Sequence, residues 1–348
     1  MTARWIAGVA VVVLTALGSG ALARGEPFAW NLPRGFPVPR VPVDNPMTPE
    51  KVSLGRYLFY DTRLSANGTQ SCATCHEQAR AFTDGRGRAV GSTGQVHPRS
   101  SMSLANVAYA SALTWGNPAV TRLEDQALLP MFGDQPIELG LVRPADAFLA
   151  RLRSEPTYRR LFPAAFGDGD VVTIANVTRA LAAFERTMIS GRSPYDRYIF
   201  GRENDAISAA AKRGERLFFS ESLACFQCHG GFTFTDAPDF DGRRHRAPEY
   251  QDNGLTKDAG AFKATTLRNV EVTAPYMHDG SLPTLEAVID AYATGGRDSV
   301  NKSPVMHAFT ITPDQKRDLI AFLNALTDEA FLHDAALADP WPATRKDR

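Results

Sequence analysis

The stretch Cys72-Ala73-Thr74-Cys75-His76 occurs again in the second half of the chain as Cys225-Phe226-Gln227-Cys228-His229. In a helical turn, the two cysteines and the histidine of such a run lie on one face. Both thiols can then reach the vinyl groups of a haem while the imidazole binds its iron, and C-x-x-C-H is the attachment signature of c-type haem. We therefore predict two covalently bound haem c groups, with His76 and His229 as iron ligands.

The two motifs use all four cysteines of the 348-residue chain, so none is left for a disulfide. A thioredoxin-like redox pair would need only one C-x-x-C run. A zinc site with four thiolate ligands would leave both adjoining histidines unexplained. Two haem groups account for every cysteine and for both histidines.

The sequence around the two motifs is also repeated. The pentapeptide GRYLF at residues 55–59 precedes the first motif, and GERLF at residues 214–218 precedes the second. The tripeptide FTD follows both motifs, at residues 82–84 and 234–236. These matches predict a duplicated unit of about 150 residues, which is the usual size of one domain.

The remaining pattern is helical. Residues 170–189 carry apolar side chains at a period close to 3.6, which predicts an amphipathic core helix. Thr312-Pro313 followed by Gln315 has the form of a capped helix start. No run alternates as a strand would, so we expect an all-α fold with a first haem domain at residues 46–200 and a second at 201–348.

The first 45 residues differ from the rest. Arg4 precedes an apolar run over residues 5–17, and Ala21-Leu22-Ala23 offers a small-residue cleavage site. This pattern is typical of a secretory signal peptide at residues 1–23. The run is too short for a comfortable membrane span, so we expect a periplasmic protein without a stable membrane anchor. Residues 24–45 contain five prolines and should form an extended arm packed on the body, with a disordered linker as the alternative.

The charge balance excludes one class of partner. Lysine and arginine together number 38, as do aspartate and glutamate, so the formal net charge is zero. The chain therefore has no global basic bias toward nucleic acid.

Three long segments carry a resemblance to a known family: ALAAFERTMISGRSPYDRYIFG at residues 180–201, TLRNVEVTAPYMHDGSLPTLEAV at 266–288 and LIAFLNALT at 319–327. With both haem motifs, they make the chain similar to the bacterial di-haem cytochrome c peroxidase and MauG family. Residues 31–61 and 102–118 resemble the MbnH-type enzymes in particular. The resemblance implies two cytochrome c-like domains, in which the first haem reacts with hydrogen peroxide and the second stores or relays oxidising equivalents.

The same resemblance implies a peroxide site beside the first haem. Trp115, Gln126 and Glu138 occupy the places of the family's distal tryptophan, glutamine and glutamate. Glu138 would take a proton from peroxide and return it to the departing oxygen, and Gln126 would hold peroxide or water. Without the resemblance, Trp115 would read as a core residue and Glu138 as a solvated carboxylate. Gln126 and Glu138 are two residues further apart than in the family pattern, so Glu124 and Asp125 remain alternatives.

His97 precedes Pro98-Arg99-Ser100 and does not match the family's blocking histidine in spacing. We therefore expect His97 at the surface or as a residue that supports the site. The first haem would then keep an open position for peroxide, which is the condition of MauG.

At the second haem, the resemblance implies that Tyr292 is the distal iron ligand. In the family's electron-relay peroxidases a methionine follows the threonine that opens the distal helix by eight residues, whereas Tyr292 follows Thr284 here, as in MauG. A phenolate is a hard anion that stabilises oxidised iron, and a thioether favours the ferrous state. Met277 and Met306 remain alternative ligands, and Tyr292 can also be read as a packing residue.

Smaller features concern the region between the haems. MauG has a tryptophan two residues before the second motif, where this chain has Leu223, so the route between the haems must differ. Thr273 and Pro275 match positions whose carbonyls bind calcium in the family, although Ser100 replaces the usual asparagine; one calcium ion is expected on this ground alone. His278 is a rival iron ligand or a hydrogen-bonding residue near the haem edge.

Three classes of function follow. The first, favoured by Tyr292, is a peroxide-dependent enzyme that forms a high-valent di-haem state and oxidises a residue on a partner protein. The resemblance implies a small secreted copper-binding partner of the MbnP kind, whose tryptophan would become kynurenine. The second is a cytochrome c peroxidase that removes peroxide with electrons from a small cytochrome or cupredoxin. The third is a di-haem electron carrier without catalysis.

Overall fold

The computed structural model describes residues 28–235, 250–256, 260–298 and 300–342. The expected signal peptide and the first four residues of the arm lie outside these ranges, as does Asp236 of the second FTD repeat. The described residues contain helices and no strand, which confirms the all-α prediction. β-type pairing among them is limited to isolated bridges.

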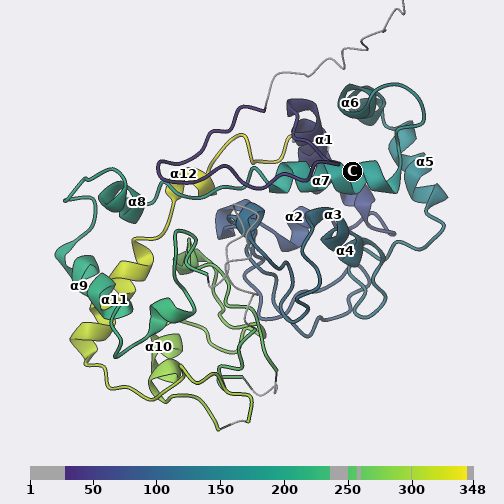
Figure 1. The fold of residues 1–348 in the computed structure, drawn as a ribbon. Coiled ribbons are helices and arrows are strands. Elements are labelled where there is room, and N and C mark those ends of the chain that lie inside the picture. Colours follow the sequence, from purple (N-terminus) through teal and green to yellow (C-terminus); the bar gives the residue numbers. More distant parts are fainter. Residues whose placement is uncertain (1–27, 236–249, 257–259, 299, 343–348) are drawn as a thin grey trace, which may run out of the picture.

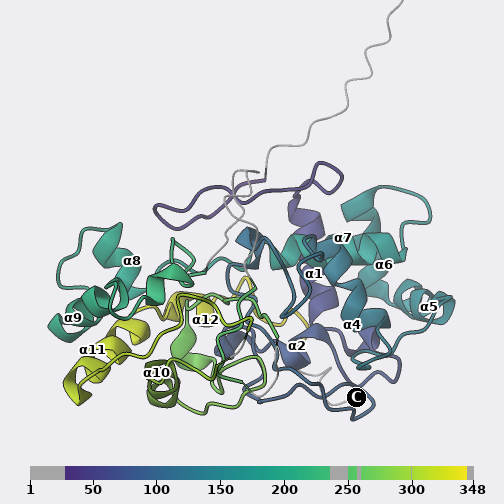
Figure 2. The ribbon, with the colours of Figure 1, turned by 60° about the horizontal axis from the view of Figure 1, so that its bottom comes forward.

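The helices fall into α-helices and short 3-10 helices. The α-helices are α1 (Pro49–Phe59), α2 (Cys72–Cys75), α3 (Leu123–Gln126), α4 (Leu128–Phe132), α5 (Asp146–Ser154), α6 (Pro156–Phe166), α7 (Ile174–Glu185), α8 (Pro194–Ile199), α9 (Ala209–Phe218), α10 (Leu285–Ala293), α11 (Pro313–Asn324) and α12 (Glu329–Leu332). The 3-10 helices are η1 (Thr62–Leu64), η2 (Gln78–Arg80), η3 (Val107–Tyr109), η4 (Cys225–Gln227) and η5 (Val270–Val272). Helices α1 to α7 gather on one side of the molecule and α8 to α11 on the other, with α12 between them (Figures 1 and 2).

The first core forms where α1 packs against α7. Helix α1 starts at Thr48, whose side chain accepts a hydrogen bond from the Lys51 N–H, and Pro49 occupies its first turn, where proline needs no hydrogen bond. Leu54 and Leu58 face α7 and are fully buried. Gly55 allows the close approach, since a Cβ there would lie 1.9 Å from the Ala180 carbonyl oxygen of α7.

The second core repeats this arrangement with α9 and α11. Helix α11 begins with the predicted capping box, in which the Thr312 side chain and the Gln315 side chain each bond the other's backbone N–H. Gly214 of α9 matches Gly55, because a Cβ there would lie 1.9 Å from the Asp318 carbonyl oxygen. The two helix pairs therefore cross in the same way, as expected of a duplicated unit.

The duplication extends to unusual backbone conformations. Phe82 and Phe234, the first residues of the two FTD repeats, have φ angles of +62° and +52°. Asn106 and Asn269 have φ angles of +62° and +61°, and each is followed by a 3-10 helix, η3 or η5. Asparagine tolerates this left-handed region better than most residues. Such agreement between distant segments points to two copies of one unit.

The end of the chain returns to the first core. Phe331, Leu332 and Leu337 are buried there with residues of α1 and α7. The Arg56 side chain donates to the Ala338 carbonyl at 2.6 Å, and the Tyr60 hydroxyl donates to the Leu337 carbonyl at 2.7 Å. The last described residues therefore tie the second half of the chain to the first.

The described part of the proline-rich arm, residues 28–45, crosses the two halves (Figure 2). Phe36 is buried in a small cluster with Tyr109 and Ile189, and Trp30 and Leu32 pack against its edge. Apolar side chains thus hold this segment on the body, although it contains no regular helix.

The crossing at Gly55 yields a stability prediction. Gly55→Ala should lower the free energy of unfolding by about 1–3 kcal/mol, because the added methyl group forces α1 away from α7. Gly116→Ala is a suitable control, since the nearest atom to its Cβ would be 4.0 Å away, and it should change stability by less than about 0.5 kcal/mol. Denaturant unfolding of the haem-loaded proteins measures both, and equal midpoints for the two variants would contradict the packing argument.

Candidate di-haem site

The first motif presents its histidine in a form suited to bind iron. The Nδ1 atom of His76 donates to the Phe82 carbonyl at 2.8 Å, which leaves Nε2 free. That carbonyl is held in a tight turn, where the Phe82 N–H donates to the Glu77 carbonyl at 2.9 Å. Burial lowers the pKa of His76, so the ring stays neutral. Histidines that bind metals commonly donate their second ring N–H to a backbone carbonyl in this way.

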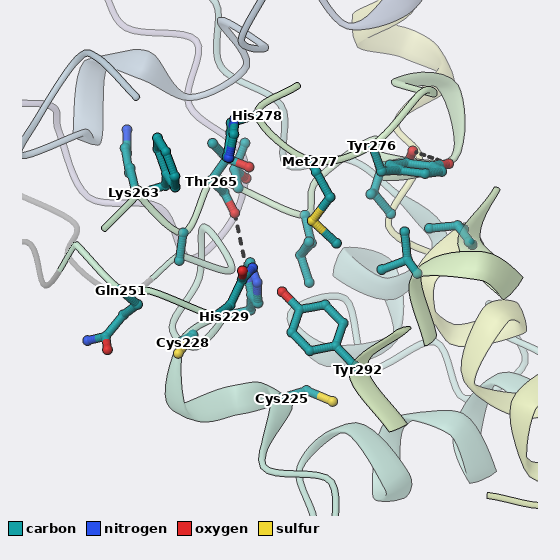
Figure 3. Close-up of a pocket in the computed structure, with 18 of the residues that line it drawn as sticks. Cys225, Cys228, His229, Gln251, Lys263, Thr265, Tyr276, Met277, His278 and Tyr292 are labelled. Carbon is teal, nitrogen blue, oxygen red and sulfur yellow. Dashed lines mark hydrogen bonds between the residues drawn. The ribbon is translucent and has the colours of Figure 1, made fainter. Parts of the chain in front are cut away.

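The second motif repeats this geometry with a different carbonyl. The Nδ1 atom of His229 donates to the Thr265 carbonyl at 3.1 Å, shown as a dashed line in Figure 3. Burial lowers the pKa of His229 as well. The ring faces the interior of a large, mostly apolar pocket of about 250 Å³, and Cys225 and Cys228 lie on the same wall. Both histidines therefore offer a neutral Nε2 for iron.

The arrangement of the thiols fits covalent attachment of haem better than a disulfide or a zinc site. None of the four cysteines forms a disulfide, and burial raises the pKa of Cys75 to about 11 and that of Cys225 to about 12. In the described part of the chain, no three His, Cys, Asp or Glu side chains gather as a metal site would require. The four thiols are therefore not assembled as a zinc centre.

Tyr292 lies in the last turn of α10 and points across the pocket toward His229 (Figure 3). Its side chain is surrounded by protein except toward this pocket, and desolvation raises the pKa of the phenol to about 12. The side chain of Asn253 lies within hydrogen-bonding reach and opposes that rise. The side-chain oxygen of Asn253 accepts a hydrogen bond from the Leu255 N–H at 3.0 Å. The side-chain NH₂ group of Asn253 therefore remains to donate to the phenol.

The rival ligands line the same pocket. Met277 and Met306 both contribute to its wall, and Figure 3 shows Met277 and Tyr292 among the residues that line it. The Nε2 atom of His278 pairs with the Thr256 hydroxyl at 2.9 Å. The His278 ring also stacks on Phe262, with centroids 3.7 Å apart. His278 is thus a buried hydrogen-bonding residue of the pocket wall.

Glu138 lies at the end of a turn closed by a bridge between Asp134 and Ile137. Burial is the main cause of the raised pKa values of the Cys72 and Cys75 thiols, and the Glu138 carboxylate adds to the rise, which indicates that Glu138 lies near the first motif. The side chain is 40% exposed, so a small molecule can reach it. Partial burial nevertheless raises its pKa to about 7, which suits a group that takes and returns a proton near neutral pH.

His97 is not a surface residue, which corrects one of the two expectations for it. Only 9% of the residue is exposed, and its Nε2 atom lies 4.0 Å from the Glu138 carboxylate. The reason is local pairing: the His97 N–H donates to the Ala89 carbonyl at 2.8 Å, and Val90 bridges Val96, which turns the loop inward.

The other two residues expected beside the first haem, Trp115 and Gln126, make no hydrogen bond to Glu138 within the described residues. Trp115 lines the large pocket; its indole N–H donates to the Ser100 carbonyl at 2.8 Å, and its ring meets His278 edge to face. Gln126 ends α3, is partly buried and makes no side-chain hydrogen bond within the described residues. The role of Gln126 beside the first haem therefore stays a prediction.

The two rival carboxylates have other tasks. Glu124 is buried, pairs with Arg186 at 2.9 Å and accepts a hydrogen bond from Asn45 at 2.7 Å. It is therefore part of a buried structural network. Asp125 is exposed and lies 3.7 Å from Arg122. Neither acts on the thiols of the first motif as Glu138 does.

The positions expected to bind calcium surround the same pocket. Ser100, Thr273 and Pro275 all line it. The Ser100 hydroxyl donates to the Met277 carbonyl at 3.2 Å, and the Thr273 hydroxyl donates to the Val270 carbonyl at 3.0 Å. These hydroxyl groups support the loop, and calcium binding by the carbonyls stays a prediction.

Sequence reasoning missed two residues of this region. Glu185 of α7 is buried beside Cys72, and burial raises its pKa to about 8. The sequence did contain an indication, because Glu185 lies between Phe184 and Met188 on the apolar face of the predicted helix. Asn253, which faces Tyr292, had no signal, because the loop that carries it is positioned by bridges from Gln251 to Phe262 and from Asp252 to Lys302.

The arrangement defines a class of protein. Each half offers two thiols outside any disulfide and a neutral histidine whose Nδ1 donates to a backbone carbonyl, and these residues fit a haem c group. An all-α fold with two such sites in duplicated halves is that of a di-haem c-type cytochrome protein.

Comparison with known proteins then gives the family. The model of di-haem cytochrome c peroxidase matches residues 49–204, and that of RoxA-like cytochrome c matches residues 261–294. The chain is 39% identical to methylamine utilization protein MauG of Methylorubrum extorquens over 306 residues, or 85% of this chain and 83% of that protein. It is 31% identical to cytochrome c551 peroxidase of Nitrosomonas europaea over 302 residues, or 84% of each chain.

A solved structure agrees. The crystal structure of a MauG-like protein associated with microbial copper homeostasis matches with a TM-score of 0.85 and 41% identity, over 90% of this chain and 100% of that one. The chain therefore belongs to the di-haem cytochrome c peroxidase and MauG family, and it is a haem c-dependent oxidoreductase of the peroxidase type. In the residues that the structure describes, no helix has the length and apolar character needed to cross a membrane.

The raised pKa of Glu138 gives a pH prediction. If its carboxylate takes the proton of peroxide, the reaction should speed up as pH rises through about 7, where the acid ionises. Glu138→Gln should slow the reaction by about 10²–10⁴-fold, remove this pH dependence and leave both haems bound. Stopped-flow absorbance with peroxide measures the rate, and the exposed Asp125→Asn variant is the control. Unchanged kinetics in Glu138→Gln would assign the proton transfer elsewhere.

Proposed function

We propose that this protein uses hydrogen peroxide to oxidise a tryptophan side chain on a small secreted copper-binding protein. The observation that carries the proposal is the placement of Tyr292, whose phenol faces His229 across the pocket. A phenolate on iron favours the oxidised state, so the second haem is suited to hold oxidising equivalents instead of collecting electrons from a reduced cytochrome.

The chain's own residues divide the chemistry between the two sites. Haem c, when bound, supplies iron that accepts the oxidising equivalents of peroxide and passes them on. At the first site, Glu138 takes a proton from the incoming peroxide and returns it to the oxygen that leaves as water. At the second site, His229 and Tyr292 are the residues that would hold the haem iron, and the mostly apolar walls of the pocket limit the access of water.

The overall reaction balances with peroxide as oxidant. Conversion of tryptophan to kynurenine replaces one carbon of the side chain by one oxygen, and the carbon leaves as formate. Two molecules of hydrogen peroxide accept the four electrons, so that tryptophan and two peroxides give kynurenine, formate and one water. Because a partner protein cannot enter the buried pocket, its side chain would be oxidised at a distance by electron transfer through the protein.

The choice of partner rests on similarity. The solved relative with 41% identity is described as a MauG-like protein associated with microbial copper homeostasis. A copper-binding partner of the MbnP kind fits that association. We place the mature enzyme in the periplasm, where such a partner would also be exported.

A second function has its own support. Met277 and Met306 line the pocket of the second haem and offer thioether ligands, and cytochrome c551 peroxidase is among the relatives. With thioether ligation the enzyme would remove peroxide with electrons from a small cytochrome or cupredoxin.

One substitution separates the two functions. Tyr292→Met should raise the reduction potential of the second haem, because a neutral thioether replaces an anion, and should abolish partner oxidation while leaving the first haem reactive toward peroxide. Met306→Leu is the matched control and should leave both properties unchanged. The assay mixes enzyme, peroxide and partner and weighs the partner by mass spectrometry. An unmodified partner together with rapid oxidation of reduced cytochrome c by the native enzyme would assign the protein to the cytochrome c peroxidases.

A further inference from the structure

The buried imidazole of His97 has no role in the mechanism described so far. Its Nε2 atom is shielded from solvent and has no hydrogen-bond partner among the described residues. Buried polar nitrogens in folded proteins are almost always paired, so an unpaired one calls for an explanation. The ionisable group facing it is the Glu138 carboxylate, 4.0 Å away.

Two loops hold these side chains together. The Ser92 N–H donates to the Glu138 carbonyl at 2.7 Å, and the Ile137 N–H donates to the Gln95 side chain at 2.8 Å. Gly91 lies directly against this turn, because a Cβ there would be 1.8 Å from the Ile137 carbonyl oxygen. The loop that carries His97 is therefore fixed against the turn that carries Glu138.

We propose that His97 is a positioning residue, which donates its Nε2 proton to the Glu138 carboxylate and holds that carboxylate toward the peroxide site. The proposal deepens the proposed function and rests on its assignment of Glu138 as the proton-transfer group. No electron or covalent bond changes hands in this step; the imidazole keeps its proton and stays neutral.

The gap between the two atoms is closed by Glu138. A hydrogen bond needs about 2.7–3.2 Å between nitrogen and oxygen. His97 is packed in place, whereas the Glu138 side chain is 40% exposed and is not held by a side-chain hydrogen bond among the described residues. Hydrogen bonds in active sites are often long without substrate and shorten when it binds.

Other charges near the pair are few. Asp84 acts on His97 and favours its protonated form, but burial has the larger effect and lowers the pKa of His97. Glu138 acts on the Cys72 and Cys75 thiols, which become uncharged thioethers once haem is attached. Arg86 acts on Cys75. His97 is thus a neutral donor at the pH where Glu138 ionises.

The pH profile of the peroxide reaction tests the proposal on the haem-loaded protein. Donation to the carboxylate favours its ionised form. His97→Phe should therefore shift the midpoint of the profile upward by about one pH unit, a loss of about tenfold at low pH that vanishes at high pH. His97→Gln, which keeps an N–H donor near the same place, should restore most of the native profile.

Two controls make the result specific. His333 on α12 is an exposed histidine 3.5 Å from Glu329, and His333→Phe should leave the profile unchanged. In a Glu138→Gln background, His97→Phe should have no further effect.

A profile that does not shift, or a rate lowered equally at all pH values without rescue by glutamine, would overturn the proposal. Partner oxidation is read separately by mass, so its absence alongside a shifted profile would contradict only the choice of substrate.

Discussion

The structure depends on one recurring hydrogen bond, from the Nδ1 atom of each motif histidine to a backbone carbonyl. His76 uses the Phe82 carbonyl and His229 the Thr265 carbonyl. This bond fixes the tautomer, so that Nε2 keeps the lone pair that iron requires. The helix pairs are duplicated with the motifs, but the two carbonyls are not equivalent positions, because Phe82 opens the first FTD repeat whereas Thr265 lies 36 positions after His229. The fold therefore consists of two similar halves, each of which orients one imidazole through a hydrogen bond to a backbone carbonyl.

The two halves orient their histidines alike, but the residues beside the two haem motifs differ. Beside the first motif lies a partly exposed carboxylate with a raised pKa, and beside the second lies a phenol in an apolar pocket. A reachable acid–base group suits a site that handles peroxide, and the proposed ligation of iron by the Tyr292 phenol would suit a site that stores oxidising equivalents. This chain has Leu223 where MauG has a tryptophan between the haems. Trp115 and His278 line the wall of the same pocket and provide other aromatic groups in this region.

The sequence predicted what local spacing determines. The haem motifs, the all-α fold and the capping box at Thr312 depend on residues within a few positions of one another, and the helix at 174–185 lies within its predicted range. The setting of His97 depends on backbone pairing with a turn some forty residues away, which no periodic pattern reveals. The same is true of Glu124, whose partner Arg186 lies 62 positions along the chain. Glu124 and Glu138 differ in the residues that surround them in the folded chain, Arg186 for Glu124 and His97 for Glu138, and the sequence alone does not reveal this difference.

The central claim is that each half of the chain binds its own covalent haem. Intact-mass spectrometry of the exported protein under denaturing conditions tests it most directly, because thioether bonds survive unfolding. We predict the mass of the mature chain plus two haem groups for the native protein, and plus one haem group when Cys225 and Cys228 are both replaced by serine. A native protein that carries fewer than two haem groups would contradict it.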